Sequence, residues 1–127
     1  MSTPKILAFS GSIRKDSFNK QLAKIAMHCA EQNGAEVTFV DLRDYQMPLY
    51  CGDWHEEEGI PENAIAFKAL MKSHNGFLIA SPEYNGSLTG ILKNTIDWAT
   101  IRHGEEERMA CFSGKIAGLM CAAPGIG

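Results

Sequence analysis

Short apolar runs alternate with segments of helical periodicity along the whole chain, and this alternation constrains the fold more than any other feature. The runs at 5–10, 36–42, 76–81 and 115–123 predict strands. The first of them, KILAFS, is apolar almost throughout, as expected of a strand that is buried on both faces. Strands that alternate with helices are typical of a parallel sheet with helices on both faces.

Segments between the runs carry apolar residues at three- and four-residue spacing, which predicts helices. The first helix is expected at 17–33 with Asp16 or Ser17 as its N-cap, the second begins at Pro61, and the third spans 90–100. The stretch 43–60, with its prolines, glycines and acidic residues, is predicted to be a long loop. The apolar positions that define the first two helices are Phe18, Leu22, Ile25 and Cys29, and then Ala64, Phe67, Leu70 and Met71.

Length and charge narrow the possible functions. A chain of 127 residues forms about one domain, which we take as 1–127. The net charge of −3 argues against a nucleic-acid partner. No apolar segment approaches the ~20 residues that cross a membrane, and the start lacks the long apolar core of an export signal. The four cysteines and four histidines fit no zinc pattern, so we expect no bound metal. We expect the cysteines to be reduced thiols in a cytoplasmic protein, and the histidines to lie at the surface.

The turn after the first strand holds more hydrogen-bond donors than a connection needs. The hydroxyls of Ser10, Ser12 and Ser17 would meet the N-terminus of a helix there, which favours a bound phosphate. Arg14 adds a planar guanidinium that can bond two phosphate oxygens. The turn has one glycine and matches neither a P-loop nor a dinucleotide fingerprint, so a mononucleotide phosphate fits best. In the alternative interpretation, Ser17 only caps the helix and Arg14 is a solvated loop residue.

Two motifs together resemble a known family. The first is G-S-x-R-x-x-S-x-N, beginning at Gly11, and the second is P-E-Y-N-G-S at 82–87, which is followed by LKNTIDW at 92–98. In this order the motifs are similar to those of the NADPH-dependent FMN reductase family, whose members include quinone, chromate and azo-dye reductases. The resemblance implies an α/β protein with a flavodoxin-like, doubly wound parallel sheet in three α/β/α layers.

The resemblance also implies a cofactor and its binding residues. Bound FMN would carry the redox chemistry between NADPH or NADH and a small-molecule electron acceptor such as a quinone, so no catalytic side chain is expected. The helix at 90–100 would belong to the interface of a homodimer or homotetramer. The residues implied around the FMN phosphate and ribityl chain are Ser10, Ser12, Arg14, Ser17, Phe18 and Asn19, and those along the flavin ring are Pro82, Glu83, Tyr84, Asn85, Gly86 and Ser87.

Two alternatives to a reductase stay open. One is a flavodoxin-like electron carrier that binds FMN and meets a protein partner without using a nicotinamide. The other follows from a departure from the family, whose members continue past APGIG at 123–127. In this alternative, the chain is a flavodoxin-like domain that is truncated after the fourth strand and is C-terminally incomplete relative to the family. It would have an open sheet edge and would not bind flavin tightly.

Overall fold

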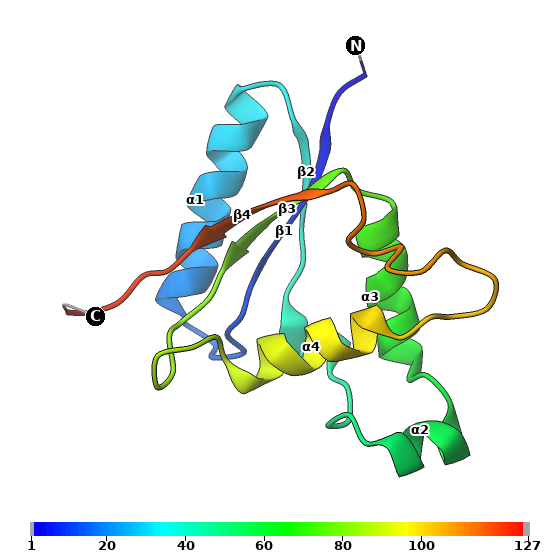
Figure 1. Ribbon diagram of the computed structural model, residues 1–127. Coiled ribbons are helices and arrows are strands. Elements are labelled where there is room, and N and C mark those ends of the chain that lie inside the picture. The colour runs from blue at the N-terminus through cyan, green and yellow to red at the C-terminus, as the bar shows by residue number, and fades with distance from the viewer. Residues whose placement is uncertain (1, 126–127) are drawn as a thin grey trace.

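The computed structural model describes residues 2–125 and contains one parallel sheet with the strand order β2-β1-β3-β4 (Figure 1). The chain leaves β1 toward β2 on one side and returns to place β3 and β4 on the other. The strand order therefore reverses beside β1, which confirms the predicted doubly wound sheet. The elements are β1 (Lys5–Ser10), α1 (Phe18–Gln32), β2 (Glu36–Phe39), the 3-10 helix η1 (Leu42–Tyr45), α2 (Gly52–Glu58), α3 (Glu62–Lys72), β3 (Gly76–Ala80), α4 (Gly90–Thr100) and β4 (Ile116–Met120).

Helices cover both faces of the sheet, so the predicted three-layer arrangement is confirmed. In Figure 1, α1 lies on one side of the strands, and α3 and α4 lie on the other. Leu7 of β1 is paired in register with Phe77 of β3, and both side chains join the core under α3 and α4. Ala8 points to the opposite face, where it and Ala23 of α1 are fully buried.

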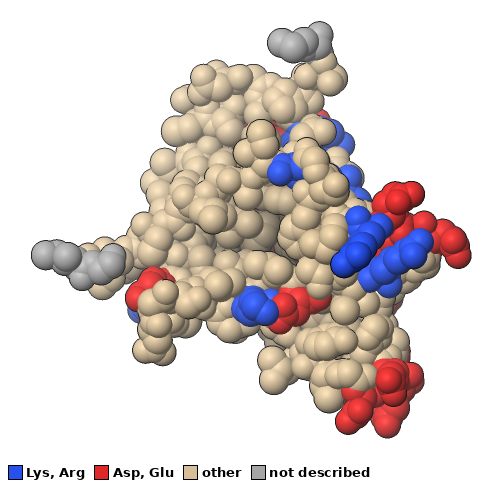
Figure 2. Space-filling model, viewed as in Figure 1, with Lys and Arg blue, Asp and Glu red and all other residues tan. Residues whose placement is uncertain are grey.

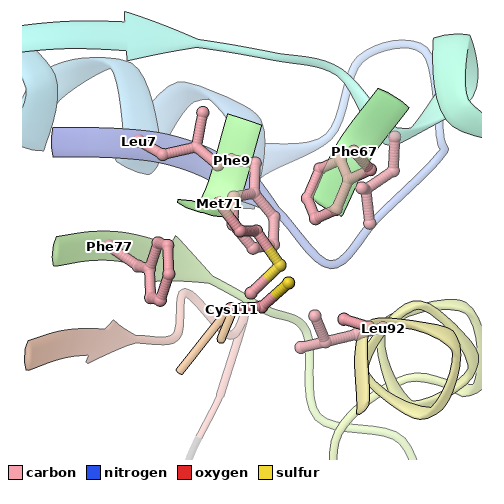
Figure 3. Packing of buried hydrophobic residues seen from close by; sticks show 9 residues of the cluster. Leu7, Phe9, Phe67, Met71, Phe77, Leu92 and Cys111 are labelled. Carbon is pink, nitrogen blue, oxygen red and sulfur yellow. The ribbon is translucent and has the colours of Figure 1, made fainter. Parts of the chain in front are cut away.

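The larger part of the core lies between the sheet and the helices α3 and α4. Figure 3 shows Phe9 of β1, Phe67 and Met71 of α3, and Leu92 of α4 converging on one another. The rings of Phe9 and Phe67 meet edge to face with their centroids 5.2 Å apart. This packing fixes where α4 begins, and the start of α4 borders the candidate site.

The prediction of a long loop at 43–60 is wrong, because this stretch contains part of η1 and all of α2. Tertiary contacts hold it in place. Trp98 of α4 donates from its indole nitrogen to the carbonyl oxygen of Pro48 at 2.8 Å. The ring centroids of Trp54 and Trp98 are 5.8 Å apart. Asp41 caps η1 by accepting a backbone N–H. Trp98 is distant in the sequence and Asp41 lies just before the stretch, so the pattern of prolines and glycines within 43–60 did not reveal either partner.

The apolar spacing in α1 predicted the helix correctly but not its buried face. Phe18 and Ile25 are 67% and 61% exposed, whereas Asn19, Lys20 and Ala23 are buried. Helix α1 therefore presents a mostly small and polar face to the sheet. Its apolar stripe lies beside the end of β4 and remains uncovered among the described residues.

Three further predictions need correction. His74 was expected at the surface, but it is buried at the turn between α3 and β3, where its Nδ1 lies 2.6 Å from the carbonyl oxygen of Leu70. The second strand ends at Phe39 and not at 42, because Asp41 starts η1. The fourth strand is shorter than predicted and covers Ile116–Met120.

The surface is unevenly charged. Figure 2 shows acidic side chains over α2 and a mixed group of charges over the segment that follows α4, whereas the side formed by α1 carries few charges in this view. On β4, Ile116 and Leu119 are 83% and 75% exposed. Among residues 2–125, no helix has the length and apolar character that crossing a membrane requires.

Candidate functional site

The loops that follow β1, β3 and β4 leave the sheet at the same edge and start side by side. The backbone N–H of Gly11 donates to Ala80 at 2.9 Å, and that of Ser81 donates to Met120 at 2.9 Å. The hydrogen-bond ladder thus extends one residue beyond the strands. These loops lie at the carboxyl ends of the strands and next to the reversal of strand order, where parallel sheets bind ligands.

The three serines of the first turn are buried, and their oxygens accept backbone hydrogen bonds. The Oγ of Ser10 accepts from the N–H of Ser12, and the Oγ of Ser12 accepts from the N–H of Arg14, both at 3.1 Å. The Oγ of Ser17 accepts two N–H groups in the first turn of α1, at 3.1 and 3.3 Å. Each hydroxyl retains its own proton for donation to a ligand. Ser17 is therefore the N-cap of α1 while still being a donor.

Backbone donors add to these hydroxyls. Among the residues that the structure describes, the N–H groups of Ile13 and Phe18 have no hydrogen-bond acceptor. The side chain of Arg14 is exposed and also lacks a partner among them. An unpaired N–H group in the turn and another at the start of α1, together with a guanidinium, favour an anion. The turn has the donors that a phosphate needs.

Gly11 allows the first and second loops to approach each other closely. A Cβ on Gly11 would lie 2.4 Å from the Oγ and 2.9 Å from the Cβ of Ser81. Thr89 joins the same two loops, since its hydroxyl donates to the carbonyl oxygen of Gly11 at 2.5 Å and accepts from the N–H of Leu92 at 3.2 Å. Thr89 is thus both the N-cap of α4 and a link to the turn after β1.

The second loop forms a tight two-residue turn. Tyr84 and Ser87 exchange two backbone hydrogen bonds at 2.9 and 3.2 Å, while Asn85 and Gly86 both have positive φ, at 55° and 82°. This is the backbone of a type I′ hairpin turn, which Asn-Gly favours. Glu83 stabilises it by accepting the N–H of Gly86 at 2.6 Å. Asn85 and Gly86 therefore set the backbone, and Tyr84 is left exposed at the site.

A groove of about 400 Å³ joins the two loops to the start of α4. Its volume falls within the range of small-molecule sites. Of the predicted residues, it brings together Ser12, Arg14 and Tyr84. The full lining is Gly11, Ser12, Ile13, Arg14, Tyr84, Thr89, Gly90 and Ile91.

Comparison with known proteins identifies the family. The family model for NADPH-dependent FMN reductase matches residues 4–127. The chain belongs to this family. A 2-hydroxy-1,4-benzoquinone reductase of a Burkholderia species is 43% identical over 101 residues, which cover 80% of this chain and 52% of that protein. An NAD(P)H-dependent FMN reductase of Pseudomonas aeruginosa is 35% identical over 121 residues, covering 95% of this chain and 60% of that protein.

Solved structures agree with the fold. FerB, a flavoenzyme NAD(P)H:(acceptor) oxidoreductase from Paracoccus denitrificans, matches with a TM-score of 0.77 and 31% identity over 98% of this chain and 63% of that one. An FMN-dependent NADH-azoreductase from Bacillus anthracis, solved with FMN, matches with a TM-score of 0.66 and 17% identity over 98% of this chain and 70% of that one. The chain spans about half the length of the Burkholderia benzoquinone reductase and three-fifths of the length of the Pseudomonas aeruginosa FMN reductase.

Of the predicted site residues that do not line the groove, Phe18 and Asn19 are directed to the segment after β4. Phe18 lines a separate apolar depression of about 440 Å³ beside residues 122–124. Asn19 is buried, and its side chain bonds to the backbone of Ala122. The third predicted loop, 122–127, is described only as far as 125. The groove residues Thr89, Gly90 and Ile91 were missed, although a threonine before a helical segment is itself an N-cap signal.

The remaining predicted residues belong to the two loops that form the groove but do not line it. Ser10 and Ser17 are buried, and their oxygens accept the backbone hydrogen bonds that shape the turn. The carbonyl oxygen of Pro82 accepts the hydroxyl of Ser81 at 3.0 Å, so Pro82 lies at the entry to the second loop. Ser87 closes the type I′ turn opposite Tyr84.

One ion pair involves the first turn of α1, directly after the donor-rich turn. The ammonium of Lys20 lies 2.9 Å from Asp41 at the end of β2. Burial alone would raise the pKa of Asp41, but the hydrogen bonds from Lys20 and from the backbone of Arg43 outweigh burial, so this pKa lies below its usual value. The pair is neutral overall, so the positive charge near the turn comes from Arg14 and Lys15. Within residues 2–125, no three His, Cys, Asp or Glu side chains gather as metal ligands.

Proposed function

We propose that this chain forms the FMN site of an NAD(P)H-dependent oxidoreductase that reduces quinones or similar small, electron-poor acceptors by two electrons. One observation carries the proposal. Ser12 and Arg14 of the donor-rich turn share a groove with Tyr84 of the second loop, at the reversal of strand order. Family membership and the names of the relatives, which include a benzoquinone reductase and an FMN reductase, support the same assignment.

The turn at 10–19, which we call the phosphate turn, would hold the cofactor by charge and by geometry. The hydroxyls of Ser10, Ser12 and Ser17 would donate to phosphate or ribityl oxygens, because each oxygen is held by a backbone N–H and each hydroxyl still has its own proton to donate. Arg14 would pair with the phosphate from the solvent side. Each hydrogen bond to a charged oxygen contributes about 1.5–3 kcal/mol, so this acidic chain can bind an anion locally despite its net charge of −3.

The second loop would provide the wall beside the flavin ring. Tyr84 is exposed at the groove, and the type I′ turn behind it is fixed by Glu83. Since the carboxylate of Glu83 already accepts a backbone N–H, its role is to hold the turn. When bound, FMN would supply the chemistry by accepting a hydride from NADPH or NADH and passing two electrons to the acceptor. We therefore assign no catalytic side chain.

We also propose that the protein works in the cytoplasm as a homodimer or homotetramer. The four cysteines are free thiols, which suits a reducing compartment. Exposed apolar side chains such as Leu49, Ile116 and Leu119 offer contact area for a second copy.

The first experiment records the visible absorbance of the purified chain with added FMN, followed by NADPH or NADH without oxygen and then by a benzoquinone. A reductase binds flavin, bleaches with the nicotinamide and recovers its colour with the quinone. A chain that binds FMN but is bleached only slowly by either nicotinamide would act as an electron carrier instead. A chain that takes up no FMN would contradict the proposal.

A further inference from the structure

The side chain of Asn19 is occupied by a partner more than a hundred residues away. Its Nδ2 donates to the carbonyl oxygen of Ala122 at 3.2 Å, and its Oδ1 accepts the N–H of Ala122 at 2.9 Å. Asn19 is only 4% exposed. A side-chain amide that both donates to and accepts from one residue pairs with the backbone as a neighbouring strand would. It holds the chain directly after β4 against the start of α1.

The same residue is tied to the phosphate turn through its backbone. The N–H of Asn19 donates to the Oγ of Ser17 at 3.1 Å. A continuous path of hydrogen bonds therefore runs from the hydroxyl of Ser17, through Asn19, to the backbone of Ala122. Asn19 is the contact in this path that joins the loop after β1 to the loop after β4.

We propose that Asn19 is a positioning residue that fastens the segment 121–125 to the phosphate turn, so that an anion bound at the turn also orders this segment. The coupling rests on the function proposed above, whereas the fastening does not. An anion held by Ser17 would fix the first turn of α1. It would thereby also fix the side chain of Asn19, which is hydrogen-bonded to Ala122. Because such coupling is reciprocal, loosening the segment would in turn weaken anion binding.

This role differs from that of a direct phosphate ligand. Both polar atoms of the Asn19 side chain are directed to Ala122, and Asn19 does not line the groove that contains Arg14. A residue that positions the segment would change exchange at Ala122 in the ligand-free protein as well as phosphate binding. A residue that only touches the phosphate would change phosphate binding alone, as we expect for Arg14.

The fastening is tested by hydrogen exchange of the Ala122 amide, measured by NMR in the ligand-free protein. In Asn19→Ala, we expect this amide to exchange about 5- to 10-fold faster, because it loses its acceptor. Asn19→Asp retains an oxygen acceptor and should keep most of the protection, even if Asn19→Ala proves poorly folded. Asn33→Ala is the matched control, since the side chain of this exposed asparagine, the C-cap of α1, donates to the carbonyl oxygen of Cys29 and makes no contact with Ala122. Unchanged exchange at Ala122 in Asn19→Ala would overturn the proposal.

The coupling is tested by adding inorganic phosphate or FMN, and by titrating FMN into the parent, Asn19→Ala and Arg14→Ala. Ligand should slow exchange at Ala122 in the parent but not in Asn19→Ala. Asn19→Ala should weaken FMN by about 5- to 10-fold, whereas Arg14→Ala should weaken FMN without changing exchange at Ala122 in the ligand-free protein. If Asn19→Ala weakened FMN while Ala122 in the ligand-free protein exchanged as in the parent, Asn19 would be a phosphate ligand and the positioning role would be wrong. If the parent bound no flavin while Asn19→Ala still exposed Ala122, the proposed function would fail and the fastening would stand.

Discussion

At the scale of single residues, Gly11 decides whether the two loops of the site can meet. We expect Gly11→Ala to cost about 1–3 kcal/mol of stability and to weaken FMN binding, since its Cβ would lie 2.9 Å from the Cβ of Ser81. Urea unfolding and flavin titration measure the two effects. Gly52→Ala is the control, because its Cβ would meet nothing within 4 Å. Equal losses in both variants would mean that the close approach is unimportant.

Arg14 is the residue that best separates binding from folding. Its side chain has no partner among the described residues, so Arg14→Ala should leave the free energy of unfolding nearly unchanged. We expect FMN to bind more weakly by about 1.5–3 kcal/mol, which fluorescence titration would detect. Arg108→Ala, in the exposed segment after α4, serves as the control. A variant that holds FMN as tightly as the parent would leave Arg14 as a solvated loop residue.

At the scale of elements, a buried ion pair holds the segment between α4 and β4 onto α3. Lys68 is 2% exposed and bonds to Glu106, which also lies 2.8 Å from Lys72. We expect Glu106→Gln to cost about 2–4 kcal/mol, because Lys68 would remain buried without its counter-charge. Chemical unfolding of Glu106→Gln beside the exposed control Glu105→Gln measures this difference. A loss within about 0.5 kcal/mol of the control would contradict it.

The same pair gives a pH dependence with a definite sign. Burial alone would raise the pKa of Glu106, but hydrogen bonds from Lys68 and Lys72 lower it from 4.5 to about 2. The charged form is thus favoured in the folded state, so its stabilisation is complete above about pH 4.5 and is lost as the pH falls toward 2. The gap in stability between the parent and Glu106→Gln should narrow over this window. A gap that stays constant from pH 5 to pH 2.5 would contradict the assignment.

At the scale of the whole molecule, β4 is the least covered strand. Ile116 and Leu119 are 83% and 75% exposed, and no described strand pairs with the outer edge of β4. Such an edge invites pairing with another chain. We expect self-association that rises with concentration in light scattering, and we expect Ile116→Lys to weaken it by about tenfold or more. If Leu49→Lys had the larger effect, the contact would lie elsewhere.

Prediction from the sequence succeeded where a few neighbouring residues hold the information. Ser17 marked the start of α1, and Pro61 lies directly before α3, because caps and fixed φ angles act within one helical turn. The prediction for 43–60 was wrong because α2 and η1 depend on Trp98 and Asp41, which lie outside this stretch. The prediction for His74 was wrong for the same reason, since Lys115, which bonds to its carbonyl oxygen, lies 41 residues away.

The sequence by itself determined the alternation of strands and helices and the donor-rich chemistry of the turn at 10–19. Only the tertiary structure decided which residues line the groove and which, like Asn19, reach across to Ala122 instead. The reason is physical. Periodicity and capping arise from interactions over a few residues, whereas the groove and the Asn19 contact exist only once the strand order β2-β1-β3-β4 brings three distant loops to one edge of the sheet.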